Sequence, residues 1–192
     1  VLPKQDETDS IAAAAEYDYS IVHVDCGRKY FSPTYLKQII DSAKAGGFNQ
    51  VELYLSDNQG FRLALDDMNV KVKVGDEETT YDLTPALGDG YNEYDKTTKK
   101  PTKTTDGSGK YLTQSEMTEI IKYANGKGID IVPCINVPGH MGAILEEFTS
   151  FRYSGSKSSI DLENDKAKQF ALEITRKYAK YFKEQGVKYY NI

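Results

Sequence analysis

The chain has 192 residues, a formal net charge of -5, 39% hydrophobic residues and 28% charged residues. This composition suffices to bury one core and leaves little for a second domain. The acidic balance argues against a nucleic-acid partner, because proteins that bind nucleic acid usually carry a clustered basic face. No apolar run approaches the roughly 18 residues of a membrane helix, so we expect no membrane insertion.

The first elements predict a strand, a helix and a second strand. SIVHVDC, residues 20–26, is a mostly apolar run typical of a parallel strand covered on both faces. A serine cap and a first-turn proline open the next segment, apolar residues recur in it at helical spacing, and two glycines close it. These signals predict a helix over residues 33–45. NQVELYLS, residues 49–56, then predicts a second covered strand.

A long excursion follows the second strand. Val70, Val72 and Val74 alternate with polar residues before a Gly-Asp turn, which predicts a β-hairpin. TPALGDG, residues 84–90, predicts a short helical turn, and residues 91–109 are rich in Lys, Thr, Asp and Gly. A loop of this length after a parallel strand indicates either a functional or a partly disordered segment.

Two more helices and two more strands complete the chain. Thr113 and Glu116 form a capping-box pattern, which predicts a helix before the third strand, IDIVPCIN, residues 129–136. An apolar stripe at helical spacing predicts a third helix over residues 164–185. VKYYNI, residues 187–192, predicts a fourth strand.

The alternation of strands and helices predicts an α/β fold, either an open doubly wound sheet or part of a (β/α)8 barrel. No GxGxxG turn follows the first strand, which favours the barrel. A complete barrel takes about 250 residues. We therefore interpret residues 20–192 as the N-terminal half of a TIM barrel, with about four parallel strands, three crossover helices and a β-hairpin insertion after the second strand. Residues 1–19 are interpreted as a lead-in segment.

Polar residues gather where the predicted strands end. Any one of them alone is more typical of a loop cap or a surface ion pair. The carboxyl ends of parallel strands meet at one mouth, so together these residues predict a polar ligand site. They are Asp25 and Arg28 after the first strand, Asp57, Asn58, Gln59 and Arg62 after the second, and Asn136 and His140 after the third.

Two long stretches carry a resemblance to a known family. They are VDCGRKYFSPTYLKQIIDSAKAGGFNQVELYLSDNQGFRLAL and YLTQSEMTEIIKYANGKGIDIVPCINVPGHM. They resemble the N-terminal half of the catalytic barrel of family 20 glycoside hydrolases, the β-N-acetylhexosaminidases, and in particular the branch of streptococcal cell-surface hexosaminidases. The PGH motif alone is weak, but the ordered set of DxQGFR and IxPxINxPGH is specific. The resemblance runs from about Ser20 to the C-terminus.

The resemblance implies an enzyme that hydrolyses terminal non-reducing N-acetylhexosamine residues from glycans. In this family the substrate's own acetamido oxygen attacks the anomeric carbon, and the configuration is retained. The matching positions here are Asp57 and His140 for support of the catalytic glutamate, and Arg28 and Asn136 for substrate binding. Further candidates are Asp25, Arg62 and, as sugar-stacking rings in the long loop, Tyr91 and Tyr94.

The sequence departs from the commoner family pattern at three positions. Many members carry His in place of Tyr54, Glu in place of Cys134 and Asp in place of Asn136. The outer polar shell of the site is therefore less acidic here, which leaves the preference for linkage and leaving group open.

In this family an Asp-Glu pair just after the fourth strand orients the acetamido group and protonates the leaving oxygen. The sequence stops at KYYNI, within that predicted strand. We therefore expect the chain alone to be inactive. A half barrel leaves strand edges and apolar surface uncovered, so we expect self-association or binding to the missing half. The resemblance further implies no cofactor, no metal and an extracellular or cell-surface location.

Two alternatives stay open at this point. A non-catalytic carbohydrate-binding or scaffold protein with a degenerate barrel would share these features. A metal-dependent barrel enzyme is disfavoured, because His23 is expected to be buried in the first strand and no HxH pair accompanies it. Cys26 and Cys134 lack a CxxC or Cys/His cluster, which favours two small buried residues over a redox or metal pair.

Overall fold

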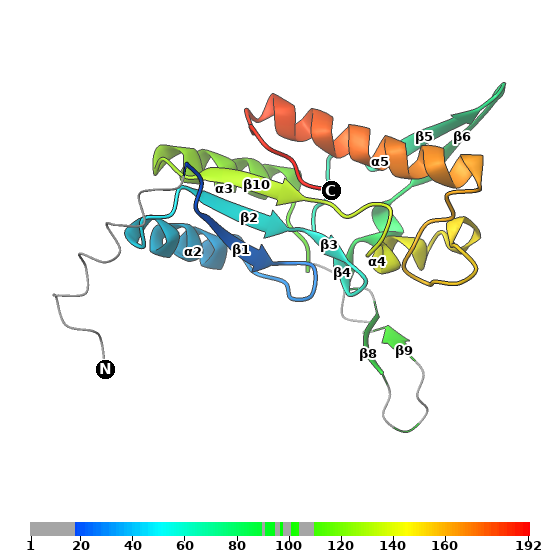
Figure 1. The fold of residues 1–192 in the computed structure, drawn as a ribbon, viewed down its shortest axis with the longest axis horizontal. Helices are drawn as coiled ribbons and strands as arrows, with labels where there is room; N and C mark the ends of the chain where they lie inside the picture. The colour runs from blue at the N-terminus through cyan, green and yellow to red at the C-terminus, as the bar shows by residue number, and fades with distance from the viewer. Residues whose placement is uncertain (1–17, 90, 95–96, 98–100, 104–109) are drawn as a thin grey trace.

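A computed structural model of the chain describes residues 18–89, 91–94, 97, 101–103 and 110–192. Its main sheet has three parallel strands in the order β1 (Ile21–Asp25), β2 (Gln50–Tyr54) and β10 (Asp130–Cys134). The strands run in step, so that Asp25, Tyr54 and Cys134 lie level with one another. The carboxyl ends of all three strands therefore meet at one edge of the sheet (Figure 1).

Two helices connect these strands and pack with the sheet, as the sequence predicts. Helix α2 (Pro33–Ala45) begins at Ser32, whose side chain accepts a hydrogen bond from the Tyr35 backbone N–H. Helix α3 (Gln114–Gly126) begins with a complete capping box between Thr113 and Glu116. Their buried faces form one core with the sheet. It includes Leu36 and Ile40 of α2, Ile120 and Ile121 of α3, and Val51 and Leu53 of β2.

Helix α5 (Asp165–Glu184) is capped by the Asn164 side chain, which accepts from two backbone N–H groups. It lies beside the hairpin formed by β5 (Asn69–Val74) and β6 (Glu77–Asp82), as Figure 1 shows. The buried Tyr178 hydroxyl donates to the backbone carbonyl of Leu63 at 2.7 Å and anchors the helix. None of the described helices is long and apolar enough to cross a membrane.

The segment after β2 forms a separate small antiparallel sheet of β3 (Ser56–Asp57), β4 (Gly60–Phe61) and β7 (Gly88–Asp89). The described part of the excursion also contains η2 (Thr84–Ala86), β8 (Tyr91–Tyr94) and β9 (Pro101–Lys103). Its two ends lie side by side, because Leu63 and Leu112 form a parallel bridge. The backbone N–H of Leu112 donates to Arg62 O, and that of Ala64 donates to Leu112 O, both at 2.8 Å. Two short helices, α4 (Gly142–Leu145) and η3 (Thr149–Phe151), follow β10.

The prediction of a fourth strand over residues 187–192 is wrong in extent. The segment lies next to β10 in the parallel direction, but it forms a single bridge between Asn191 and Cys134. Asn191 N donates to Pro133 O at 2.9 Å, and Ile135 N donates to Asn191 O at 3.3 Å. Apolar content alone does not make a strand, which forms only where backbone partners continue along its length.

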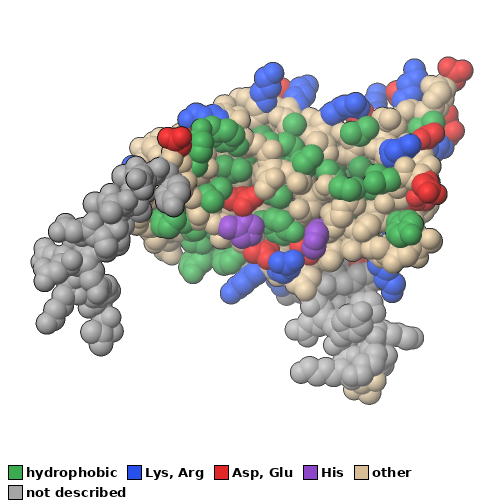
Figure 2. Space-filling model, viewed as in Figure 1, with side chains coloured by type: hydrophobic (Ala, Val, Ile, Leu, Met, Phe, Trp, Pro, Cys, Tyr) green, Lys and Arg blue, Asp and Glu red, His purple; other side chains and the backbone are tan. Residues whose placement is uncertain are grey.

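The expectation that every strand is covered on both faces is wrong for β1. Helices α2 and α3 pack on one face of the sheet, while Ile21 and His23 project from the other and are exposed. His23 is therefore not buried, and its Nδ1 lies 2.7 Å from Glu52 Oε2. Asn191 Nδ2 donates to the other oxygen of the same carboxylate at 2.6 Å. Figure 2 shows both histidines of the chain on the viewed face, with acidic and basic side chains close to them.

Candidate functional site

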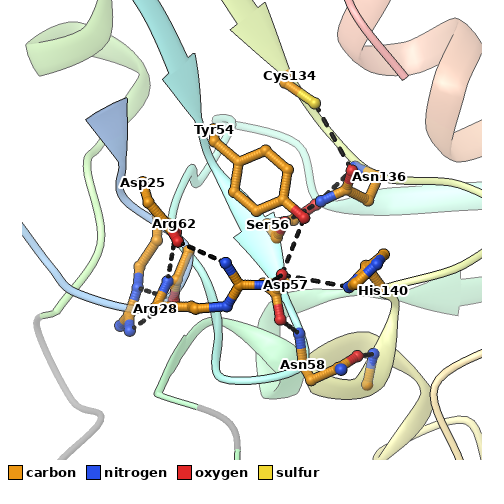
Figure 3. Close-up of polar contacts among 12 residues, drawn as sticks. Asp25, Arg28, Tyr54, Ser56, Asp57, Asn58, Arg62, Cys134, Asn136 and His140 are labelled. Carbon is orange, nitrogen blue, oxygen red and sulfur yellow. Dashed lines mark hydrogen bonds and ion pairs between the residues drawn. The ribbon is translucent and has the colours of Figure 1, made fainter. Parts of the chain in front are cut away.

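The centre of the site is the Asp57 carboxylate at the end of β3, of which 2% is exposed. Its Oδ2 accepts a hydrogen bond from the Tyr54 hydroxyl at 2.8 Å. The same oxygen lies 3.1 Å from Arg28 Nη2 and 3.4 Å from His140 Nδ1 (Figure 3). Its Oδ1 accepts from the Asn58 backbone N–H. A buried carboxylate is costly unless it is paired and hydrogen-bonded, and the two hydrogen bonds and two ion-pair contacts meet that requirement.

Arg28 is held in place from the first strand. Asp25 accepts from the Arg28 backbone N–H at 3.0 Å and from Nη1 at 2.8 Å, so it fixes both the turn and the guanidinium. The Asp57 carboxylate raises the pKa of Arg28 above its ordinary value. The Arg28 side chain is 51% exposed. It presents a permanent positive charge and a planar set of N–H donors at the mouth, which suits binding of hydroxyl groups.

His140 reaches the same carboxylate from the loop after β10. Its φ of 54° lies in the left-handed region, where His is more tolerated than most residues. The loop is fastened to the β3–β4 turn by Gly142, whose backbone N–H donates to Asn58 Oδ1 at 3.1 Å. A Cβ atom at Gly142 would lie 2.8 Å from that oxygen, so this close approach requires glycine. The His140 side chain is 57% exposed and remains open to a ligand or a further side chain.

Asn136 lies beside this cluster, and its amide is already used within the protein. Its backbone N–H donates to Ser56 Oγ at 2.7 Å, and its side-chain amide donates to the Ser56 carbonyl. The Cys134 thiol lies 3.6 Å from the Asn136 side-chain oxygen. These bonds join the end of β10 to β3. Substrate binding by Asn136 stays a prediction.

Arg62 belongs to the support of the site. It is buried and donates to Cys26 O from Nε at 3.1 Å, to Gly27 O from Nη2 at 3.1 Å and to Lys110 O from Nη1 at 3.0 Å. It thereby joins the Arg28 turn to the two ends of the excursion. The remaining candidates, Tyr91 and Tyr94, lie on β8, and their side chains are outside the described residues.

The sequence did not reveal the part that Tyr54 and Ser56 play in the cluster. Tyr54 stands out in the sequence only as a departure from the family pattern, and no motif marks Ser56. Strand periodicity offered one signal, because it places Tyr54 on the same sheet face as Asp25 at the mouth. The hydrogen bond to Asp57 follows from the turn that β3 makes, which no local pattern encodes.

The assembled site combines one exposed cation, one buried anion and one exposed imidazole. Such a set can bind hydroxyl groups through Arg28 and fix the orientation and tautomer of His140 through Asp57. Among the described residues, no group of three or more His, Cys, Asp or Glu side chains could hold a metal ion. Cys26 and Cys134 are both buried free thiols, and burial raises the pKa of each to about 12.

Comparison with known proteins relates this chain to a family. The family model described as glycosyl hydrolase family 20, catalytic domain, matches residues 17–190. The N,N'-diacetylchitobiase of Vibrio harveyi is 32% identical over 141 residues, which cover 71% of this chain and 15% of that protein. Beta-hexosaminidase B of Pseudoalteromonas piscicida is 31% identical over 134 residues, covering 67% of this chain and 16% of that protein.

Solved structures agree with this match. A structure of the pneumococcal virulence factor StrH aligns with a TM-score of 0.72 and 33% identity, covering 91% of this chain and 41% of that chain. The Streptomyces plicatus N-acetyl-beta-hexosaminidase aligns with a TM-score of 0.63 and 25% identity, covering 86% and 31%. The chain thus spans less than half the length of each of these relatives.

Proposed function

Because the chain belongs to glycosyl hydrolase family 20, we propose that it forms part of a β-N-acetylhexosaminidase and that the Asp57 cluster lies in its active site. The substrate class would be glycans with a terminal non-reducing N-acetylhexosamine. The observation that carries the proposal is the convergence of Arg28 and His140 on the buried Asp57 from three different strand ends. The proposal includes the half-barrel interpretation of residues 20–192, the lead-in of residues 1–19 and an extracellular or cell-surface location.

In the proposed mechanism Arg28 donates hydrogen bonds to hydroxyl groups of the terminal sugar. Asp57 holds His140 through Nδ1, which leaves Nε2 of the imidazole for the carboxyl group of the general acid. That acid is a glutamate outside this sequence, next to an aspartate that orients the acetamido group. The acetamido oxygen attacks the anomeric carbon while the glutamate protonates the leaving oxygen, and water then opens the intermediate with retention.

The test compares the full gene product that carries this sequence with the 192-residue chain, using an aryl N-acetyl-β-glucosaminide. We expect turnover by the full product only, because general acid catalysis and preorganised charge supply most of the rate enhancement. Arg28→Ala should chiefly raise KM, and Asp57→Asn should chiefly lower kcat, each by roughly 10-fold or more. Lys157→Ala, at an exposed position, provides the control.

Comparable turnover by the 192-residue chain would contradict the assignment of the acid. A full gene product that binds N-acetylglucosamine without hydrolysing the aryl glycoside would contradict the enzymatic proposal and favour the degenerate, carbohydrate-binding barrel.

A further inference from the structure

Tyr54 is the last residue of β2, and its side chain lies at the strand mouth, the edge of the sheet where the carboxyl ends of β1, β2 and β10 meet. It lies level with Asp25 and Cys134 on the neighbouring strands, so all three side chains point to the same face of the sheet. The Tyr54 ring centroid is 5.5 Å from that of His23 and 6.0 Å from Arg28 Cζ. Its hydroxyl reaches Asp57 Oδ2 at 2.8 Å, the shortest of the three side-chain contacts to that oxygen (Figure 3).

The three donors on Asp57 Oδ2 differ in how firmly they are held. Arg28 and His140 are more than half exposed and sit on loops, and Arg28 also shares its guanidinium with Asp25. Tyr54 is partly buried and belongs to the central strand, which is paired on both sides. If Arg28 turns toward a ligand hydroxyl, Tyr54 is the donor that stays with the carboxylate.

The phenol also remains a donor over the whole neutral pH range. Burial, followed by the hydrogen bond to Asp57, raises the pKa of Tyr54 well above its ordinary value. The phenol therefore stays protonated and uncharged. An imidazole at this position could become a cation and compete with Arg28 and His140 for the carboxylate. A neutral phenol satisfies an Asp57 lone pair without cancelling its negative charge.

We propose that Tyr54 is a positioning residue for the reaction, which holds the Asp57 carboxylate so that Oδ2 faces both Arg28 and His140. The inference rests on the proposed function, because Tyr54 acts through Asp57 on His140 and not on the sugar. Removal of the hydroxyl leaves Oδ2 with only its two contacts to the exposed side chains of Arg28 and His140, so this oxygen is held less firmly, although Oδ1 stays bonded to the Asn58 N–H. The imidazole then loses its fixed orientation toward the general acid.

The first test is kinetic and uses Tyr54→Phe in the full gene product. Tyr178→Phe is the matched control, because it also removes a buried phenol hydroxyl with a short hydrogen bond, to Leu63 O at 2.7 Å. We expect Tyr54→Phe to lower kcat roughly 10-fold or more, since misplacement of a catalytic group is costly, with KM changed less than about twofold. Tyr178→Phe should lower thermal stability and leave kcat within about twofold of the wild type.

The second test needs no activity and uses the 192-residue chain. NMR resonances of the Arg28 Nε–H group and of the His140 ring report the two partners of Asp57. Tyr54→Phe should move both sets of resonances, and Tyr178→Phe should move neither. In an Asp57→Ala background, which leaves the Tyr54 hydroxyl no acceptor at this position, Tyr54→Phe should add no further change to either set. Tyr54→His keeps a ring N–H donor and should restore part of the kcat lost in Tyr54→Phe.

Unchanged kcat in Tyr54→Phe, or a loss expressed equally in KM, would overturn the proposal. The proposal would also be overturned if Tyr54→Phe left the resonances of Arg28 and His140 unchanged. The same holds if the substitution moved these resonances equally in a chain that lacks the Asp57 carboxylate. If the wild-type gene product lacks glycosidase activity, the proposed function fails, and with it the catalytic part of this inference. The resonances then still decide whether Tyr54 positions Asp57.

Discussion

Arg62 donates hydrogen bonds to backbone carbonyl groups of Cys26, Gly27, Gln59 and Lys110. These carbonyls belong to segments that are distant in sequence and that meet behind the strand mouth. A guanidinium suits this place, because its planar fork offers five donors with fixed directions. The buried charge thereby sets the relative positions of the turn that carries Arg28 and the strand that carries Asp57.

Arg62→Leu should lower the free energy of unfolding by about 3 kcal/mol or more, because it leaves several buried carbonyl groups without donors. Arg176→Ala is the control, since Arg176 is exposed on α5 and pairs with Glu173 one turn away. It should cost less than about 0.5 kcal/mol. Urea denaturation followed by circular dichroism measures both. Equal effects of the two substitutions would show that Arg62 does not anchor these segments.

The two cysteines should be unreactive in the folded chain. Cys26 and Cys134 are buried, and each thiol has a pKa of about 12, so the reactive thiolate is roughly 1,000-fold scarcer than for a free cysteine. Iodoacetamide at pH 8 should label neither residue in the native chain and both in urea. Mass spectrometry counts the adducts. Rapid labelling of the native chain would contradict the burial of these thiols.

Helices α2, α3 and α5 could be predicted because their signals are local. The Ser32 cap and the Thr113–Glu116 box bond within their own first turn, and the apolar stripe of α5 repeats along that helix itself. Residues 187–192 have a strand-like composition, but a strand depends on neighbours that lie far away in sequence. The candidate site residues could likewise be predicted, because their positions at strand ends are a local signal. The role of Tyr54 could not. That role depends on the path of the chain between β2 and β3.

The tie between α5 and the start of the hairpin depends on pH. Lys177 Nζ lies 2.7 Å from Asp67 Oδ2, and this hydrogen bond, with two more from Asn69, lowers the pKa of Asp67 to about 2. A carboxyl with a depressed pKa stabilises the fold above its unfolded value of about 4, and this stabilisation is lost as pH falls toward 2. Because the Asp67 side chain is 67% exposed, the effect should be modest.

Thermal melts between pH 5 and pH 2 check this expectation. The wild-type melting temperature should fall more steeply over this range than that of Asp67→Asn, which lacks the titrating group. Lys177→Met removes the hydrogen bond with the largest effect and should therefore flatten the curve in part, because the two hydrogen bonds from Asn69 remain. A double substitution that flattens it much further than either single one would indicate that the two residues act separately.

For the whole molecule, the main consequence of the fold is the face of the parallel sheet that no described helix covers. Its centre is polar, with His23 and Glu52 paired and Asn191 bonded to the same carboxylate. Its apolar exposure lies at the amino-terminal end of β1, where Tyr19 and Ile21 are exposed. We expect weak, concentration-dependent self-association through this end, because apolar surface of this kind favours association.

Ile21→Lys should abolish that association in light-scattering measurements across a concentration series. Leu172→Lys is the matched control, since Ile21 and Leu172 are each 44% exposed but Leu172 lies on α5. It should leave association unchanged. A wild-type chain that stays monomeric at all concentrations, or an equal effect of the two substitutions, would show that the sheet face does not mediate contact.

The bridge that joins the two ends of the excursion affects how the sequence of this fold can change in evolution. The chain leaves at Leu63 and returns at Leu112, and the parallel bridge between them holds the two points together. Changes within the excursion leave the geometry of the strand mouth intact only where they spare β7, which pairs with β4 beside Asp57, the Lys110 carbonyl group that accepts from Arg62, and the buried residues of β5. The bridge thus fixes where the excursion begins and ends, so that new surface can be acquired elsewhere in it without redesign of the residues around Asp57.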